Sequence, residues 1–136
     1  MAKHILVIDD EPHFRFAASV ALRRAGYRTS EAEDGREALQ RILEAQRKGE
    51  VFDLLVVDVQ MPVMSGIELL DELNRNGISI PVFAVSGYGD KAMVVELMRR
   101  GCSEFLDKPF EPEEMVKRVD TILQKMEGVN ELECKV

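Results

Sequence analysis

The stretch Ile5-Leu6-Val7-Ile8-Asp9-Asp10 places four consecutive large apolar residues directly before two acids. An apolar run without a polar residue inside it is typical of a strand that is buried on both faces. Two further runs of the same character lie at residues 54–57 and 82–85, and they are followed by Asp58 and Ser86. These runs predict a parallel sheet with polar side chains where the strands end.

Two weaker runs complete the set of strands. Residues 27–30 are half polar, which favours a strand near an edge, and residues 104–106 precede Asp107-Lys108-Pro109. Helical patterns separate all five runs, and the last has the clearest apolar stripe, Met115, Val119, Ile122, Leu123 and Met126. Alternation of strands and helices predicts an α/β protein with helices on both faces of a doubly wound parallel sheet and right-handed crossovers. Residues 127–136 lack a sustained period, so we expect a domain over 1–126 and a flexible tail.

Composition limits the class of protein. The chain has 136 residues and a mass of 15.4 kDa, which is one domain's worth, and 46% of it is apolar. Its net charge is −7, from 18 Lys and Arg against 25 Asp and Glu, which disfavours direct binding of nucleic acid. No apolar run approaches the roughly 20 residues that span a bilayer, so no membrane segment is expected. Two cysteines, Cys102 and Cys134, provide neither a disulfide framework nor a zinc site, and we expect a reducing, cytoplasmic location.

The polar residues after the strands are the candidate site. In open α/β sheets the functional groups lie beyond the carboxyl ends of the strands, so Asp9, Asp10, Asp58, Ser86 and Lys108 should meet at one rim. Three carboxylates in one crevice repel each other unless a cation offsets their charge. Magnesium prefers oxygen ligands and keeps several waters. We therefore expect Asp10 and Asp58 to be direct ligands, with Asp9 one water further out.

Each of these residues alone has an ordinary explanation. An Asp at a strand end is usually a turn residue or a helix cap, and a Ser before Gly is usually part of a turn. A Lys before Pro is usually solvated. Their joint position at the strand ends of one sheet is what favours a functional site, in which Lys108 and Ser86 could contact a phosphoryl oxygen.

Four segments carry a resemblance to a known family. They are Val7-Ile8-Asp9-Asp10-Glu11, Val56-Val57-Asp58-Val59-Gln60-Met61-Pro62-Val63-Met64-Ser65-Gly66, Ala84-Val85-Ser86-Gly87 and Phe105-Leu106-Asp107-Lys108-Pro109-Phe110. In this order the chain resembles the receiver domains of bacterial two-component response regulators, of the chemotaxis-regulator kind, over about residues 3–126. The resemblance implies a flavodoxin-like (βα)5 fold with strand order 2-1-3-4-5.

The resemblance also implies a regulatory rather than an enzymatic role. Asp58 would accept a phosphoryl group from a histidine of a sensor kinase or phosphotransfer protein, and would support its own phosphorylation and dephosphorylation. Mg²⁺, or Mn²⁺ in its place, would be held by Asp10, Asp58 and the backbone carbonyl of Gln60, with Asp9 acting through water. Lys108 would pair with the phosphoryl oxygens, and its bond to Pro109 would be cis.

A conformational switch is implied as well. Ser86 would turn toward the phosphoryl group and Phe105 would follow it inward, which would change the face made by the fourth helix, the fifth strand and the fifth helix. An unknown output protein or domain would read this face, and the chain could dimerise through it. Gln60 and Tyr88 would tune the loss of the phosphoryl group. The bulk of Tyr88 favours a long-lived phosphoryl state, which a Tyr88→Ala variant with an unchanged lifetime would contradict.

Three other functions fit these residues less well. A phosphohydrolase with an aspartyl nucleophile needs a second acid two residues after it, where this chain has Gln60. A nucleotide- or flavin-binding module is disfavoured because there is no G-x-x-x-x-G-K-[ST] motif and no glycine-rich first turn. A receiver-like scaffold that has lost phosphorylation is disfavoured because all the expected residues are present. Too few residues follow Lys108 for an output domain, so either a stand-alone regulator or a piece of a longer protein is expected.

Overall fold

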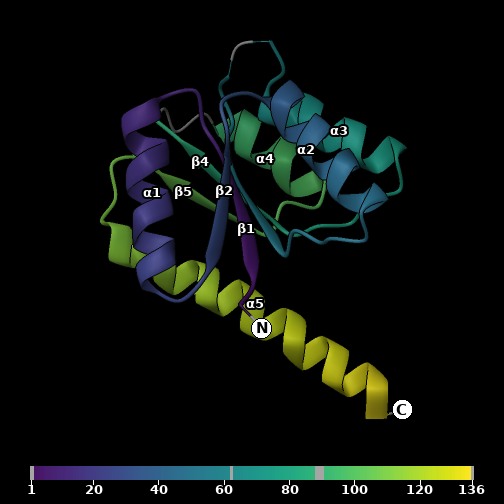
Figure 1. Ribbon diagram of the computed structural model, residues 1–136. Coiled ribbons are helices and arrows are strands. Elements are labelled where there is room, and N and C mark those ends of the chain that lie inside the picture. The colour runs from purple at the N-terminus through teal and green to yellow at the C-terminus, as the bar shows by residue number, and fades with distance from the viewer. Residues whose placement is uncertain (1, 62, 88–90, 136) are drawn as a thin grey trace.

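The computed structural model describes residues 2–61, 63–87 and 91–135, with side chains at residues 2–61, 63–87 and 92–126. In this part of the chain five strands alternate with five helices (Figure 1). They are β1 (His4–Ile8), α1 (Pro12–Arg24), β2 (Arg28–Ala32), α2 (Gly35–Arg47), β3 (Leu54–Asp58), α3 (Gly66–Arg75), β4 (Val82–Ser86), α4 (Lys91–Arg99), β5 (Glu104–Asp107) and α5 (Pro112–Lys135).

All strands pair in parallel, in the order β2-β1-β3-β4-β5. The chain therefore runs outward from β1 to β2 and then returns to the other side of β1 to continue through β3, β4 and β5. Helices α1 and α5 cover one face of the sheet, and α2, α3 and α4 cover the other (Figure 1). This confirms the predicted fold class and strand order. It also makes β1 and β3 the neighbouring strands at which the order of strand addition reverses, which is where ligands bind in open α/β sheets.

The three central strands are buried on both faces, which explains their unbroken apolar runs. Successive side chains point to opposite sides of a sheet, so each strand serves two cores. In β1, Ile5 and Val7 pack in the layer under α1 and α5, whereas Leu6 and Ile8 pack in the layer under α2, α3 and α4. Phe83 of β4 belongs to the first layer and is fully buried.

Capping residues fix the starts of three helices near the same rim. The Glu11 carboxylate accepts from the backbone N of His13 and Phe14 at the start of α1, where Pro12 occupies the first turn, a position that Pro favours. Asp34 accepts from the backbone N of Glu37 in α2. Ser65 and Glu68 form the equivalent cap of α3, with Ser65 Oγ accepting from the Glu68 backbone N.

Three details differ from the sequence prediction. The second strand is Arg28–Ala32 rather than 27–30, although it does lie at an edge of the sheet. The sequence pattern predicts that Phe14, Ala17, Ala18, Ala21 and Ala25 share one apolar face of the first helix, but Ala17 and Ala25 are exposed, and Ser19 and Leu22 are buried. The alanines were uninformative because so small a side chain suits either environment.

Helix α5 continues past Met126 to Lys135, and its last turns run beyond the sheet (Figure 1). A helix satisfies its own backbone hydrogen bonds, so it does not need an apolar stripe in order to continue. The apolar pattern therefore located the packed part of α5 and missed its end. That this terminal segment is flexible stays a prediction.

Candidate functional site

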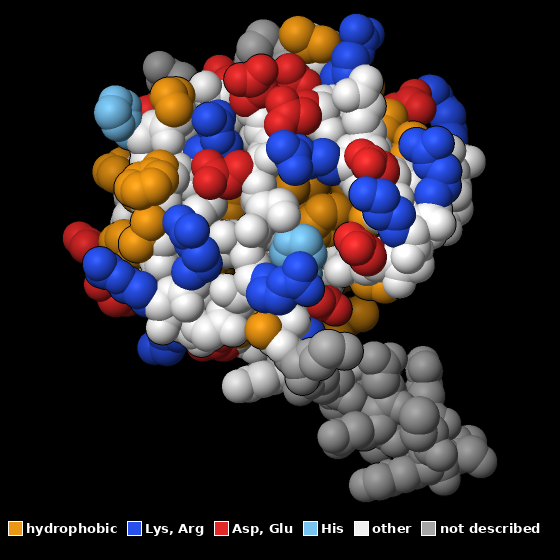
Figure 2. All heavy atoms as spheres, viewed as in Figure 1, with side chains coloured by type: hydrophobic (Ala, Val, Ile, Leu, Met, Phe, Trp, Pro, Cys, Tyr) orange, Lys and Arg blue, Asp and Glu red, His pale blue; other side chains and the backbone are white. Residues whose placement is uncertain are grey.

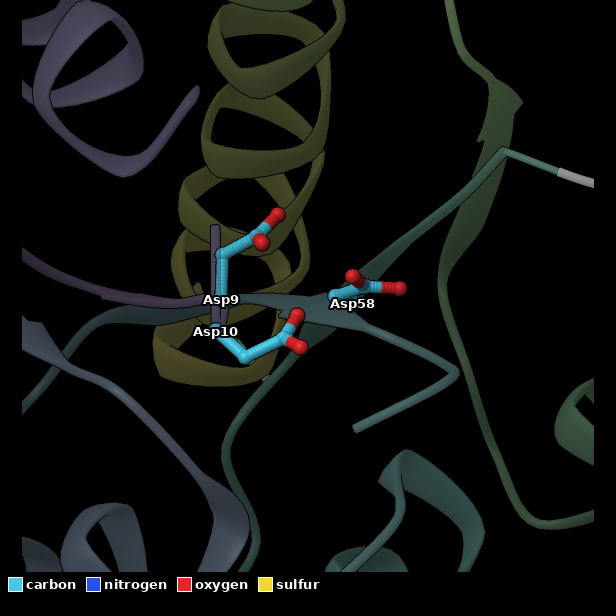
Figure 3. A group of neighbouring side chains, drawn as sticks. All are labelled: Asp9, Asp10 and Asp58. Atoms are coloured by element: carbon cyan, nitrogen blue, oxygen red, sulfur yellow. The ribbon is translucent and has the colours of Figure 1, made fainter. Parts of the chain in front are cut away.

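Three carboxylates meet where β1 and β3 end. Ile8 pairs with Val57 in the sheet, so the next residues, Asp9 and Asp58, lie side by side at the ends of their strands. Asp10 follows directly, and one carboxylate oxygen from each of these three acids lies within 4.8 Å of the others (Figure 3). The structure thus brings together the acids that the strand-end argument selected.

The three acids differ in burial. Asp9 is fully buried, Asp58 is 7% exposed, and Asp10 is exposed. Both oxygens of Asp9 already have partners, because Oδ1 accepts from the Glu11 backbone N at 2.8 Å and Oδ2 accepts from Lys108 Nζ at 2.8 Å. This leaves Asp10 and Asp58 as the acids better placed to bind a cation directly.

Lys108 reaches the acids from the end of β5. Its backbone N donates to the Ser86 carbonyl oxygen at 2.7 Å, and its peptide bond to Pro109 is cis, as the resemblance implied. The ammonium lies 3.6 Å from Asp58 Oδ2, in addition to its contact with Asp9. It also lies 4.0 Å from the centre of the Phe14 ring.

The environment of Asp58 raises its pKa to about 6. Burial is the largest cause, and the nearby charges of Asp9 and Asp10 act in the same direction. The Gln60 backbone N, which donates to Asp58 Oδ1 at 3.1 Å, and the Lys108 ammonium lower the pKa but do not cancel these effects. A carboxylate held against neighbouring negative charge is suited to a divalent cation, and the all-oxygen donor set fits a hard ion such as Mg²⁺.

The other predicted site residues are placed around this centre. Ser86 is the last residue of β4 and is buried, and Phe105 on β5 is half-buried against the layer under α2, α3 and α4. The Gln60 side chain is exposed. Tyr88 lies outside the described residues.

Sequence reasoning missed Arg15, which stabilises the backbone of the turn that carries Asp9 and Asp10. Its Nη1 donates to the carbonyl oxygen of Asp9 at 2.8 Å, and its Nε lies 3.2 Å from Glu31 Oε1 on β2. The signal was available, because helical side chains lean toward the N-terminus. A basic residue early in a helix that begins just after two acids is therefore directed back toward them.

Comparison with known proteins identifies the family. The family model described as "Response regulator receiver domain" matches residues 5–120. The chain belongs to the response regulator receiver domain family. It is 30% identical over 123 residues to the chemotaxis protein CheY of Thermotoga maritima, covering 90% of this chain and 98% of that protein. These matches confirm the family that the four motifs predicted. Receiver domains are regulatory modules of two-component systems.

Two more relatives show how widely this domain is used. The transcriptional regulatory protein ResD of Bacillus subtilis is 35% identical over 121 residues, which cover 89% of this chain and 48% of ResD. A CheY-like receiver domain structure from Methanospirillum hungatei superimposes with a TM-score of 0.84 at 25% identity, covering 94% of this chain and 98% of that one. The chain thus matches nearly all of CheY but about half of ResD.

In the part of this chain that the structure describes, no helix is both long enough and apolar enough to cross a bilayer.

Proposed function

We propose that this receiver domain is a switch that is turned on by phosphorylation of Asp58. The observation that carries the proposal is the position of the Asp58 carboxylate, which is nearly buried yet lies 3.6 Å from the Lys108 ammonium and beside two further acids. With its pKa raised to about 6, Asp58 is mostly ionised at neutral pH and can act as a nucleophile.

The donor in this proposal is a phosphohistidine of a sensor kinase or phosphotransfer protein. An oxygen of Asp58 forms a bond to phosphorus while the phosphorus–nitrogen bond of the donor breaks, and the electron pair of that bond returns to the imidazole. Such transfers depend on positioning and on neutralisation of charge more than on covalent chemistry from the protein. Lys108 supplies one positive charge for the phosphoryl oxygens.

Magnesium is the cofactor that we assign to the acidic centre. Asp10, Asp58 and the backbone carbonyl of Gln60 would hold it, with Asp9 acting through water because its own oxygens are engaged by Glu11 and Lys108. When bound, the ion supplies positive charge that the three acids lack and that the phosphoryl oxygens require. Mn²⁺ prefers the same ligands and is expected to substitute for it.

The output of the switch is assigned to the face formed by α4, β5 and α5. Ser86, at the end of β4, would hydrogen-bond the phosphoryl group, and Phe105 on the neighbouring strand would move with it. Outward on the same face, Val95 is 48% exposed and Met98 is 50% exposed. A partner protein or a second copy of the chain would bind there. Size-exclusion chromatography with and without beryllofluoride tests whether the chain forms the homodimer.

The location that we assign is the cytoplasm. Cys102 is a buried thiol that forms no disulfide with any described residue. A free thiol fits a reducing compartment.

The chemical step is tested by intact-mass measurement after incubation with Mg²⁺ and a small phosphodonor. The expected result is a gain of one phosphoryl group by the native chain and no gain by Asp58→Asn. An unchanged native mass, or an equal gain in both proteins, would contradict the proposal.

A further inference from the structure

The ring of Phe14 forms one wall of the site. Phe14 lies in the first turn of α1, where its backbone N donates to the capping carboxylate of Glu11 at 2.9 Å. Lys108 Nζ lies over the ring, 4.0 Å from its centre. An ammonium within about 6 Å of a ring centre is attracted to the negative face of the aromatic system. Phe14 therefore contacts the charged group that the proposed phosphoryl transfer uses.

A second aromatic side chain holds the Phe14 ring in place. Phe110 meets it edge to face, with ring centres 5.7 Å apart and planes at 88°. The two rings line a cavity of about 110 Å³ between α1 and the start of α5. Hydrophobic side chains gather along α1 on the surface (Figure 2), and the adjoining groove between α1 and α5 measures about 690 Å³. Phe110 thus supports the partly buried Phe14 ring on one side, within an apolar wall.

The contact between the Phe14 ring and Lys108 matters because a lysine side chain is flexible. Its ammonium is a point charge on a four-carbon stem, so its direction depends on what surrounds it. Here Asp9, Asp58 and the Phe14 ring contact the same ammonium. The two carboxylates compete with a phosphoryl group for the N–H donors of this ammonium. A ring face also attracts the ammonium, but it competes less strongly for those donors.

We propose that Phe14 is a positioning residue that holds the Lys108 ammonium beside Asp58. The inference rests on the proposed phosphorylation of Asp58, and it adds a part of the machinery on α1 that the strand-end motifs do not contain. At an exposed or half-exposed site, a cation–π contact corresponds to a change of about two- to fivefold in the equilibrium that holds the ammonium over the ring. Loss of the ring should slow phosphorylation by that factor, because Lys108 then samples positions away from Asp58.

Three variants separate this role from general packing. Phe14→Leu removes the aromatic face but keeps an apolar side chain, and Phe14→Tyr keeps the face. Phe16→Leu is the matched control, because Phe16 lies on the same helix, is 62% exposed, and lines the large groove between α1 and α5. Thermal unfolding of each variant shows whether it folds.

Two readouts are measured on each protein. The first is the NMR shift of the Lys108 methylene protons next to the ammonium, which the ring current of Phe14 should move upfield in the absence of any phosphodonor. The second is the rate of phosphoryl uptake from a small phosphodonor with Mg²⁺. A residue that merely supports the fold would not set the first readout.

The proposal expects Phe14→Leu to lose the upfield shift and to be phosphorylated about two- to fivefold more slowly. Phe14→Tyr and Phe16→Leu should keep both properties. A native shift or a native rate in Phe14→Leu would overturn the proposal. If the native chain takes up no phosphoryl group, the proposed function fails, and a lost shift in Phe14→Leu would then establish only that the ring lies over the Lys108 side chain.

Discussion

Lys108 and Asp9 form an ion pair in which the carboxylate is fully buried, with 2.8 Å between Nζ and Oδ2. The pair joins the end of β5 to the end of β1, across two intervening strands of the sheet. A buried charge is costly unless it is paired and hydrogen-bonded, so this single lysine offsets much of the cost of burying Asp9.

Replacement of Lys108 by Met should therefore destabilise the protein. Among the described residues, the variant leaves the buried Asp9 carboxylate with the Glu11 backbone N as its remaining hydrogen-bond donor, and we expect the free energy of unfolding to fall by about 2–4 kcal/mol. Urea denaturation at neutral pH measures the change. Lys117→Met, at an exposed position on α5, is the control and should change stability by less than about 0.5 kcal/mol. Equal effects in the two variants would contradict the role given to the ion pair.

The raised pKa of Asp58 predicts a pH dependence in metal-free buffer. The folded protein keeps a proton on Asp58 up to a pKa of about 6, whereas the unfolded chain releases it near the ordinary value of 3.8. The contribution of this group to stability is therefore present at low pH and is lost as pH rises through this interval. Asp58→Asn cannot ionise, so it should become more stable than the native chain by about 1–3 kcal/mol at pH 7 and not at pH 4. A difference that does not change with pH would contradict this assignment.

Magnesium should reverse much of this instability. An ion that binds the folded acidic centre and not the unfolded chain is expected to raise the melting temperature of the native protein as its concentration increases. Asp10→Asn and Asp58→Asn should each lose most of this response, and a chelator should abolish it. Differential scanning calorimetry provides the measurement. A native-sized response in both variants would show that Mg²⁺ binds elsewhere.

Val63 offers a test in the segment between β3 and α3. Its φ is 71°, in the left-handed region that a β-branched residue rarely adopts, and its side chain is 66% exposed. Asn tolerates this region better, so Val63→Asn should raise the free energy of unfolding by about 0.5–1 kcal/mol. Val51→Asn replaces a comparably exposed valine without a positive φ and should give no such gain. If Val63→Asn is destabilising, the segment is not strained in this way.

Much of the fold could be predicted from the sequence, because buried parallel strands produce apolar runs that are hard to mistake. The polar residues that follow those runs then had to meet at one rim, and Asp9, Asp10 and Asp58 do so. The difference in burial among these acids was not predictable. It depends on which partner each carboxylate meets, such as Lys108 for Asp9, and such contacts join segments far apart in the chain.

Supporting residues were harder to foresee for the same reason. Phe14 lies on α1 and looks like an ordinary helix residue, yet it contacts Lys108. Arg15 contacts the backbone of Asp9, and its place early in the helix after the two acids was the only signal for that contact. Likewise, the end of α5 at Lys135 has no apolar signal, since a helix can continue without packing against the core. The sequence pattern reports burial, and features that do not depend on burial escape it.

Locating the phosphoryl group on the chain tests the central claim most directly. After incubation with Mg²⁺ and a small phosphodonor, borohydride reduction converts a phosphorylated aspartate to homoserine, and peptide mass spectrometry identifies the modified position. We expect homoserine at position 58 in the native chain only when the phosphodonor is present. Homoserine at Asp9 or Asp10, or none at any position, would contradict the account.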